Sequence, residues 1–136
     1  MLRSHKIIID TNLWISFLLT KQFSFLDKLL AKKKVKLVFS EELLTEFIEV
    51  VKRPKLSKYF QHKDLEQLIE IIDQYAVFYS VNSTIEICRD EKDNFLLALA
   101  KASKANFLIT GDNDLLVLKK FENTEIITIA EYKIKL

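Results

Sequence analysis

Short apolar runs alternate with helix-like stretches along the chain, and this alternation limits the possible folds more than any other feature. The apolar runs predict five strands, at residues 6–10, 36–39, 77–81, 106–110 and 125–129. An apolar repeat of three to four residues predicts helices at 12–33 (broken near Lys21 and Gln22), 41–53, 55–60, 63–75, 91–104 and 114–120. Strands that alternate with helices form a parallel sheet covered on both faces. The sequence therefore predicts an α/β fold.

The composition is typical of one globular domain. The chain has 136 residues, of which 49% are hydrophobic, with one glycine and one proline. We expect a single domain over residues 1–136. Cys88 is the only cysteine, which excludes an intrachain disulfide and suits a cytoplasmic protein.

The amino-terminal segment does not have the pattern of a signal peptide. Asp10 and Asn12 interrupt its apolar run, and no small-residue cleavage site follows. No run approaches the roughly 18 apolar residues that cross a bilayer, so we expect no membrane association. A net charge of +2 says little about partners.

Two aspartates follow predicted strands. Asp10 ends the first strand in "KIIIDTNLWISFLL", and Asp112 follows the strand 106–110. Gly111 lies between that strand and Asp112, where we expect a tight turn that needs glycine. Ligands of open parallel sheets bind beyond the carboxyl ends of the strands, so both acids are candidates for a site. Each acid also fits the simpler role of a helix N-cap.

Two further acids lie in predicted helices. Asp93 shares the apolar stripe of its helix with Leu96 and Ala100, which is unusual for a carboxylate. A capping box formed by Asp90 and Asp93 is the alternative. Glu46 lies at the rim of the apolar arc of its helix, where an acid also fits as the boundary of an amphipathic surface.

The four acids Asp10, Glu46, Asp93 and Asp112 can converge at one edge of a parallel sheet. Two carboxylates about 5 Å apart repel by roughly 3 kcal/mol at an effective dielectric of about 20. Four are tolerated only when some are protonated or a cation lies among them. Oxygen ligands alone suit Mg²⁺ or Mn²⁺. The sequence shows no nucleophile arrangement built on serine, cysteine or histidine, and no glycine-rich phosphate loop.

Three segments, "IIIDTNLWISFLL", "FSEELLTEFIEVVKRPKL" and "RDEKDNFLLALAKASKANFLITGDNDLL", resemble the PIN domain. Their order and spacing are similar to those of the branch described as toxin components of bacterial and archaeal toxin–antitoxin pairs, from Lys6 to about Ile129. The resemblance implies a three-layer α/β/α fold with a central, mostly parallel sheet of about five strands. It also implies a cytoplasmic Mg²⁺- or Mn²⁺-dependent endoribonuclease with a cognate antitoxin and a possible homodimer.

The resemblance assigns roles to individual residues. It makes Asp10, Glu46, Asp93 and Asp112 the catalytic acids and metal ligands, with Asp114 and Asp90 as further candidate ligands. It makes Thr11, Asn12 and Thr110 the groups that orient these carboxylates. Two departures from the family pattern are Glu91, where proline is common, and Trp14, which we expect to fill core space.

Basic residues should surround an acidic pocket that receives RNA. We favour the segment after the Glu46 helix, with RNA-binding candidates Lys52, Arg53, Lys55 and Lys58.

Two other functions stay open. A phosphatase of the haloacid dehalogenase type needs a second aspartate where Asn12 stands, and a receiver needs an acid pair near the first strand, which is missing. A non-catalytic module that binds RNA or protein on the same fold is the other alternative, and retention of four acids argues against it.

Overall fold

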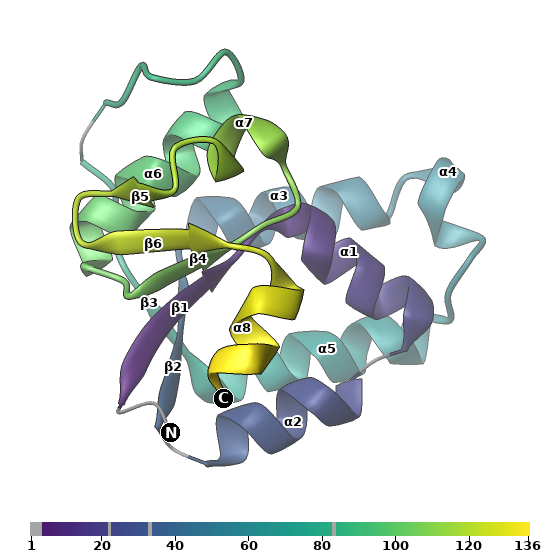
Figure 1. Cartoon of the computed structure of the whole chain (residues 1–136). Helices are drawn as coiled ribbons and strands as arrows, with labels where there is room; N and C mark the ends of the chain where they lie inside the picture. The colour runs from purple at the N-terminus through teal and green to yellow at the C-terminus, as the bar shows by residue number, and fades with distance from the viewer. Residues whose placement is uncertain (1–3, 22, 33, 83) are drawn as a thin grey trace.

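A computed structural model describes residues 4–21, 23–32, 34–82 and 84–136. Within these residues, six strands form one sheet in the order β3-β2-β1-β4-β6-β5 (Figure 1). Every neighbouring pair is parallel except β5 with β6. The predicted α/β class and mostly parallel sheet are therefore confirmed. The strands are β1 His5–Ile9, β2 Val35–Phe39, β3 Ala76–Phe78, β4 Phe107–Ile109, β5 Lys120–Phe121 and β6 Thr124–Ile127.

The helices form two groups on either side of the sheet. In Figure 1, α1, α2, α3, α5 and α8 lie on one side, and α6 and α7 lie on the other. The grouping follows from right-handed crossovers, because the chain moves outward from β1 to β3 and then returns across the sheet to β4. The helices are α1 Thr11–Thr20, α2 Phe23–Ala31, α3 Glu41–Val51, α4 Pro54–Ser57, α5 His62–Tyr75, α6 Glu91–Ser103, α7 Asn113–Leu116 and α8 Ile129–Lys135.

The strand order reverses between β1 and β4, which pair in parallel with Ile9 opposite Ile109. Asp10 and Thr110 therefore leave the sheet side by side. The backbone N–H of Asp10 still bonds the Ile109 carbonyl (2.9 Å), so Asp10 is tied to the sheet as it leaves. Such a reversal point is where open α/β sheets bind ligands.

The core is built around the central strand. Ile7, Ile8 and Ile9 are all buried, as expected for a strand that helices cover on both faces. Trp14 is fully buried and its ring contacts Phe17 and Phe39. The prediction that Trp14 fills core space is confirmed.

The predicted helix 12–33 is two helices, α1 and α2. Lys21 ends α1 in the left-handed conformation, with φ of 57°. This confirms a break at Lys21, whereas Gln22 and Lys33 lie outside the described residues. Pro54 begins α4, where its missing N–H costs nothing.

Two elements were not predicted. The strand β5 has only two residues, too few to produce a pattern. The helix α8 begins with a capping box between Thr128 and Glu131, so the predicted strand 125–129 stops at Ile127.

The prediction that Gly111 is needed for a tight turn is wrong. Gly111 does not have a positive φ, and a Cβ placed on it would meet nothing within 4 Å. In the part of the chain that the structure describes, no helix combines the length and apolar character needed to cross a bilayer.

Candidate metal centre

A pocket of about 150 Å³ lies beyond the carboxyl ends of β1 and β4. All four predicted acids line it, together with Thr11, Asn12, Asp90 and Lys92. They come from four places in the chain: the end of β1, the middle of α3, the first turn of α6 and the turn after β4. The convergence expected from the strand ends is therefore present in the structure.

Asp10 is buried, and both of its carboxylate oxygens accept hydrogen bonds. Its Oδ1 accepts from the backbone N–H of Asn12 (3.2 Å), which caps α1. Its Oδ2 accepts from the hydroxyl of Thr110 (2.7 Å), and the same hydroxyl accepts from the backbone N–H of Asp112 (3.0 Å). Asp10 is thus both a helix cap and a wall of the pocket, held in position from two sides.

Asp93 is the most unusual acid. It is 4% exposed, and among the described residues its Oδ2 has no hydrogen-bond partner. Burial raises its pKa to about 7, with further contributions from a hydrogen bond with Asp112 and from the charges of Asp112, Asp90 and Asp10. A buried carboxylate without a partner is costly when ionised, so this position favours a proton or a cation.

The alternative explanation of Asp93, a capping box formed with Asp90, is wrong. Asp90 caps α6 by accepting from the backbone N–H of Lys92 (2.9 Å). Asp93 does not complete the box, because it lies on the buried face of α6 and lines the pocket.

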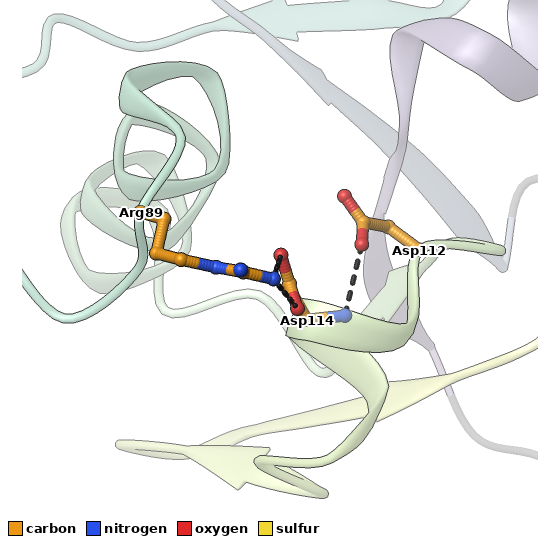
Figure 2. A network of polar contacts seen from close by, with 3 residues as sticks. All are labelled: Arg89, Asp112 and Asp114. Atoms are coloured by element: carbon orange, nitrogen blue, oxygen red, sulfur yellow. Dashed lines mark hydrogen bonds and ion pairs between the residues drawn. The ribbon is translucent and has the colours of Figure 1, made fainter.

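Asp112 and Asp114 lie at the start of α7. Asp112 caps this helix by accepting from the backbone N–H of Asp114 (2.9 Å). Asp93, Asp112 and Asp114 each offer a carboxylate oxygen, and these oxygens all lie within 4.8 Å of one another. Asp114 is also bound by Arg89, whose Nη2 donates to both carboxylate oxygens at 3.0 Å (Figure 2).

Glu46 lies on the opposite wall of the pocket, on α3. Lys92 Nζ approaches Glu46 Oε1 to 2.9 Å, which links α6 to α3. The ion pair is partly exposed, with 65% of the Lys92 side chain and 34% of the Glu46 side chain accessible. Exposed pairs of this kind contribute only about 0.2–1 kcal/mol, so a stronger ligand can displace either partner.

The remaining predicted residues occupy varied places. Thr11 and Asn12 line the pocket, and Asn12 reaches Asp10 through its backbone N–H rather than its side chain. The RNA-binding candidates lie around α4, which follows α3, and all are exposed: Lys52, Arg53, Lys55 and Lys58. Val50, shortly before them, lines the pocket.

Sequence reasoning missed Arg89 and Lys92. Both contact predicted acids, and both lie within two residues of Asp90 in the segment "RDEKD". The mixture of basic and acidic residues in that segment was the available signal, because it places cations close to carboxylates.

The donor set fits a hard divalent cation. The candidate ligands are carboxylate oxygens, with no histidine or cysteine lining the pocket, which suits Mg²⁺ or Mn²⁺. The unpartnered Oδ2 of Asp93 is an oxygen that such an ion would satisfy.

Comparison with known proteins gives two matches. The sequence model described as "PIN domain" matches residues 6–114, a range that contains every candidate ligand. The uncharacterized protein MJ1680 of the archaeon Methanocaldococcus jannaschii is 33% identical over 118 residues, covering 84% of this chain and 75% of that protein. No solved structure matches significantly. The family match favours a nuclease-type fold over the phosphatase and receiver alternatives.

Proposed function

This chain belongs to the PIN domain family, and we propose that it is a metal-dependent endoribonuclease that hydrolyses phosphodiester bonds in RNA. PIN domains are generally metal-dependent nucleases, and this chain has the acidic cluster such a reaction needs. The observation that carries the proposal is the buried Oδ2 of Asp93, which lacks a partner in a pocket lined by acids. A cation among these acids would satisfy that oxygen and offset the charge of the ionised carboxylate.

Asp10, Glu46, Asp93 and Asp112 would hold one or two Mg²⁺ or Mn²⁺ ions as the catalytic acids. Asp114 is the nearest further ligand, because its carboxylate lies within 4.8 Å of those of Asp93 and Asp112. Asp90 lies at the pocket and is exposed. Thr110 orients Asp10 through its hydroxyl, and Thr11 and Asn12 support the same wall.

A bound divalent ion would supply an acidified water, polarise a phosphoryl oxygen and offset the charge of the phosphate. The chain's own residues then have two tasks, to fix the carboxylates and to accept a proton. Asp93 is our candidate for the second task, because its buried carboxylate lines the pocket. Attack in line with the leaving group gives a 5′-phosphate and a 3′-hydroxyl.

Lys52, Arg53, Lys55 and Lys58 would bind the RNA backbone away from the cleaved bond. They are exposed and begin two residues after Val50, which lines the pocket. Contacts of this kind give binding that depends on salt and not on sequence.

In the cell, we assign the chain to the cytoplasm as a single-domain toxin of a toxin–antitoxin pair, with a possible homodimer. A ribonuclease of loose specificity would harm its host, so a cognate antitoxin would have to restrain it. The antitoxin would cover the pocket or insert a basic side chain among the acids, where it would compete with the metal.

A cleavage assay tests the enzymatic proposal. Purified protein and a labelled single-stranded RNA should give products only with Mg²⁺ or Mn²⁺, EDTA should abolish them, and the mapped ends should carry a 5′-phosphate. Asp93→Asn should be inactive, while Asp73→Asn, at an exposed position of α5, should cleave normally. RNA binding without cleavage in any metal would instead support the non-catalytic module.

A further inference from the structure

We propose that Arg89 and Lys92 bind the substrate phosphates next to the cleaved bond, and that Asp114 and Glu46 hold these two side chains until a metal ion binds the two acids. The proposal rests on the nuclease function above and names residues that bind the RNA substrate of that nuclease. It differs from the sequence prediction, which assigned phosphate binding only to the segment around α4.

The two side chains lie on either side of Asp90 in the sequence and contact acids on different elements. Arg89 extends to Asp114 at the start of α7, with both contacts at 3.0 Å (Figure 2). Lys92 extends to Glu46 on α3, at 2.9 Å. One short segment therefore supplies a cation to an acid of α7 and another to an acid of α3.

Charge explains why the cations lie on the acids in the metal-free chain. The pocket is lined by one cation, Lys92, and by five acids: Asp10, Glu46, Asp90, Asp93 and Asp112. A phosphodiester is itself negative, so the empty pocket repels it. The negative charge of the acids also attracts flexible cationic side chains nearby, and Arg89 and Lys92 are such side chains.

Exposure explains how the cations can change partners. The Arg89 side chain is 87% accessible and that of Lys92 is 65% accessible, so each is anchored only at its charged end. Ion pairs this exposed are weak, and a divalent ion outcompetes a monovalent side chain for the same carboxylate. A metal that recruits Glu46 and Asp114 would therefore release two cations at the mouth of the pocket.

The released groups suit phosphate. The planar guanidinium of Arg89 can donate two parallel hydrogen bonds to phosphate oxygens, whereas with Asp114 it uses Nη2 alone for both oxygens. Lys92 would act as a point charge.

A purely structural role for these ion pairs gives the opposite result for metal binding. If Lys92 served to position Glu46, its removal would weaken the metal site. If Lys92 competes with the metal for Glu46, its removal would leave metal affinity unchanged or increase it, while RNA binding would fall.

The experiment uses two pocket variants, Arg89→Ala and Lys92→Ala. The controls are Lys92→Arg, which keeps the charge, and Lys101→Ala, which removes one exposed cation from the last turn of the same helix α6. Binding of a fluorescent single-stranded RNA is measured in Ca²⁺ over a range of salt concentrations. Mn²⁺ affinity is measured without RNA by calorimetry, and melting temperatures verify that the variants fold.

Each pocket variant should bind the RNA about fivefold more weakly than wild type. The slope of log K against log salt should fall by about 0.7 for each cation removed. Lys101→Ala should match wild type, and Lys92→Arg, which keeps the charge, should bind RNA about as tightly as wild type. Mn²⁺ affinity of the pocket variants should equal or exceed that of wild type.

Two results would overturn the proposal: RNA binding by the pocket variants that equals that of Lys101→Ala, or Mn²⁺ affinity that falls together with RNA binding. Failure of the nuclease function would look different. The wild-type chain would not cleave RNA in any metal, even where Arg89 and Lys92 still set the salt dependence of binding.

Discussion

Thr110 Oγ1 donates a 2.7 Å hydrogen bond to Asp10 Oδ2, joining the ends of two neighbouring strands. The hydroxyl also accepts from the backbone N–H of Asp112, so one buried side chain connects two of the four acids. Each carboxylate oxygen of Asp10 has a second lone pair, which leaves it free to bind a cation. Thr110 thereby fixes the acid without using up its ligand capacity.

Replacing Thr110 by valine should damage both the fold and the site. The change keeps the shape but leaves the partly buried Asp112 N–H without its acceptor, at a cost of about 1 kcal/mol in the free energy of unfolding. Cleavage should fall by at least about tenfold, because Asp10 loses its orientation. Denaturant unfolding and cleavage rates measure the two effects.

Thr124→Val is the matched control for that variant. Thr124 is also buried, and its hydroxyl donates to the Ala105 carbonyl at 2.6 Å, away from the pocket. It should lose similar stability and keep its cleavage rate. Equal loss of cleavage in both variants would show that Thr110 acts only through stability.

Asp10→Asn should abolish cleavage while the metal-free fold stays as stable as wild type or becomes more stable. Asparagine caps helices as well as aspartate does, so the bond from the Asn12 N–H survives. Loss of the charge relieves repulsion among the acids and removes a metal ligand. Cleavage assays and metal-free thermal melts test this, and a clear drop in melting temperature would support capping as the main role of Asp10.

The metal-free chain should lose stability as the pH rises from about 4 to about 7. Burial, and then the Asp112 carboxyl, raise the pKa of Asp93 to about 7 from an ordinary 3.8. A folded-state pKa above the unfolded value means that this contribution is complete below about pH 4 and lost above about pH 7. The melting temperature of wild type should therefore fall relative to that of Asp93→Asn, whereas parallel curves would contradict the raised pKa.

Mg²⁺ or Mn²⁺ should stabilise the folded chain, because an ion that binds only the native pocket shifts the unfolding equilibrium. At an ion concentration of a hundred times Kd the gain is about 2.7 kcal/mol. The melting temperature should rise with added metal and return with EDTA. Asp93→Asn should show little of this rise, and an equal rise in that variant would place the binding site elsewhere.

Expression of wild type without a partner should slow bacterial growth, and expression of Asp10→Asn should not, because only the first can cleave RNA. Growth curves at matched soluble protein levels provide the measurement. Equal growth would count against the toxin role and leave the nuclease proposal intact, since a selective nuclease is harmless where its target is absent.

The sequence predicted the sheet and the convergence of the acids because both follow from the order of elements. Once β1 and β4 are parallel neighbours, the acids that follow them must leave the same edge. The two-residue β5 was missed because periodicity needs a longer window. The helix α8 was missed because its capping signal lies inside a run that also resembles a strand.

The contacts of Arg89 and Lys92 could not be predicted from the pattern. Their partners lie far away in the chain, and the side-chain paths depend on how the segment before α6 turns. The prediction for Gly111 failed because a lone glycine after a strand suggests a turn with a positive φ, which the backbone does not adopt.

The strand order has a consequence for the chain during its synthesis on the ribosome. β1 pairs with β2 on one edge, but its other edge is filled by β4, which is made much later. Until β4 emerges, the most apolar strand of the protein has an open edge, and the pocket lacks Asp112, which follows β4. A nascent chain therefore carries its greatest risk of misassociation before its acidic site is complete. Docking of the three-residue strand β4 closes the open edge of β1 and brings Asp112 to the pocket.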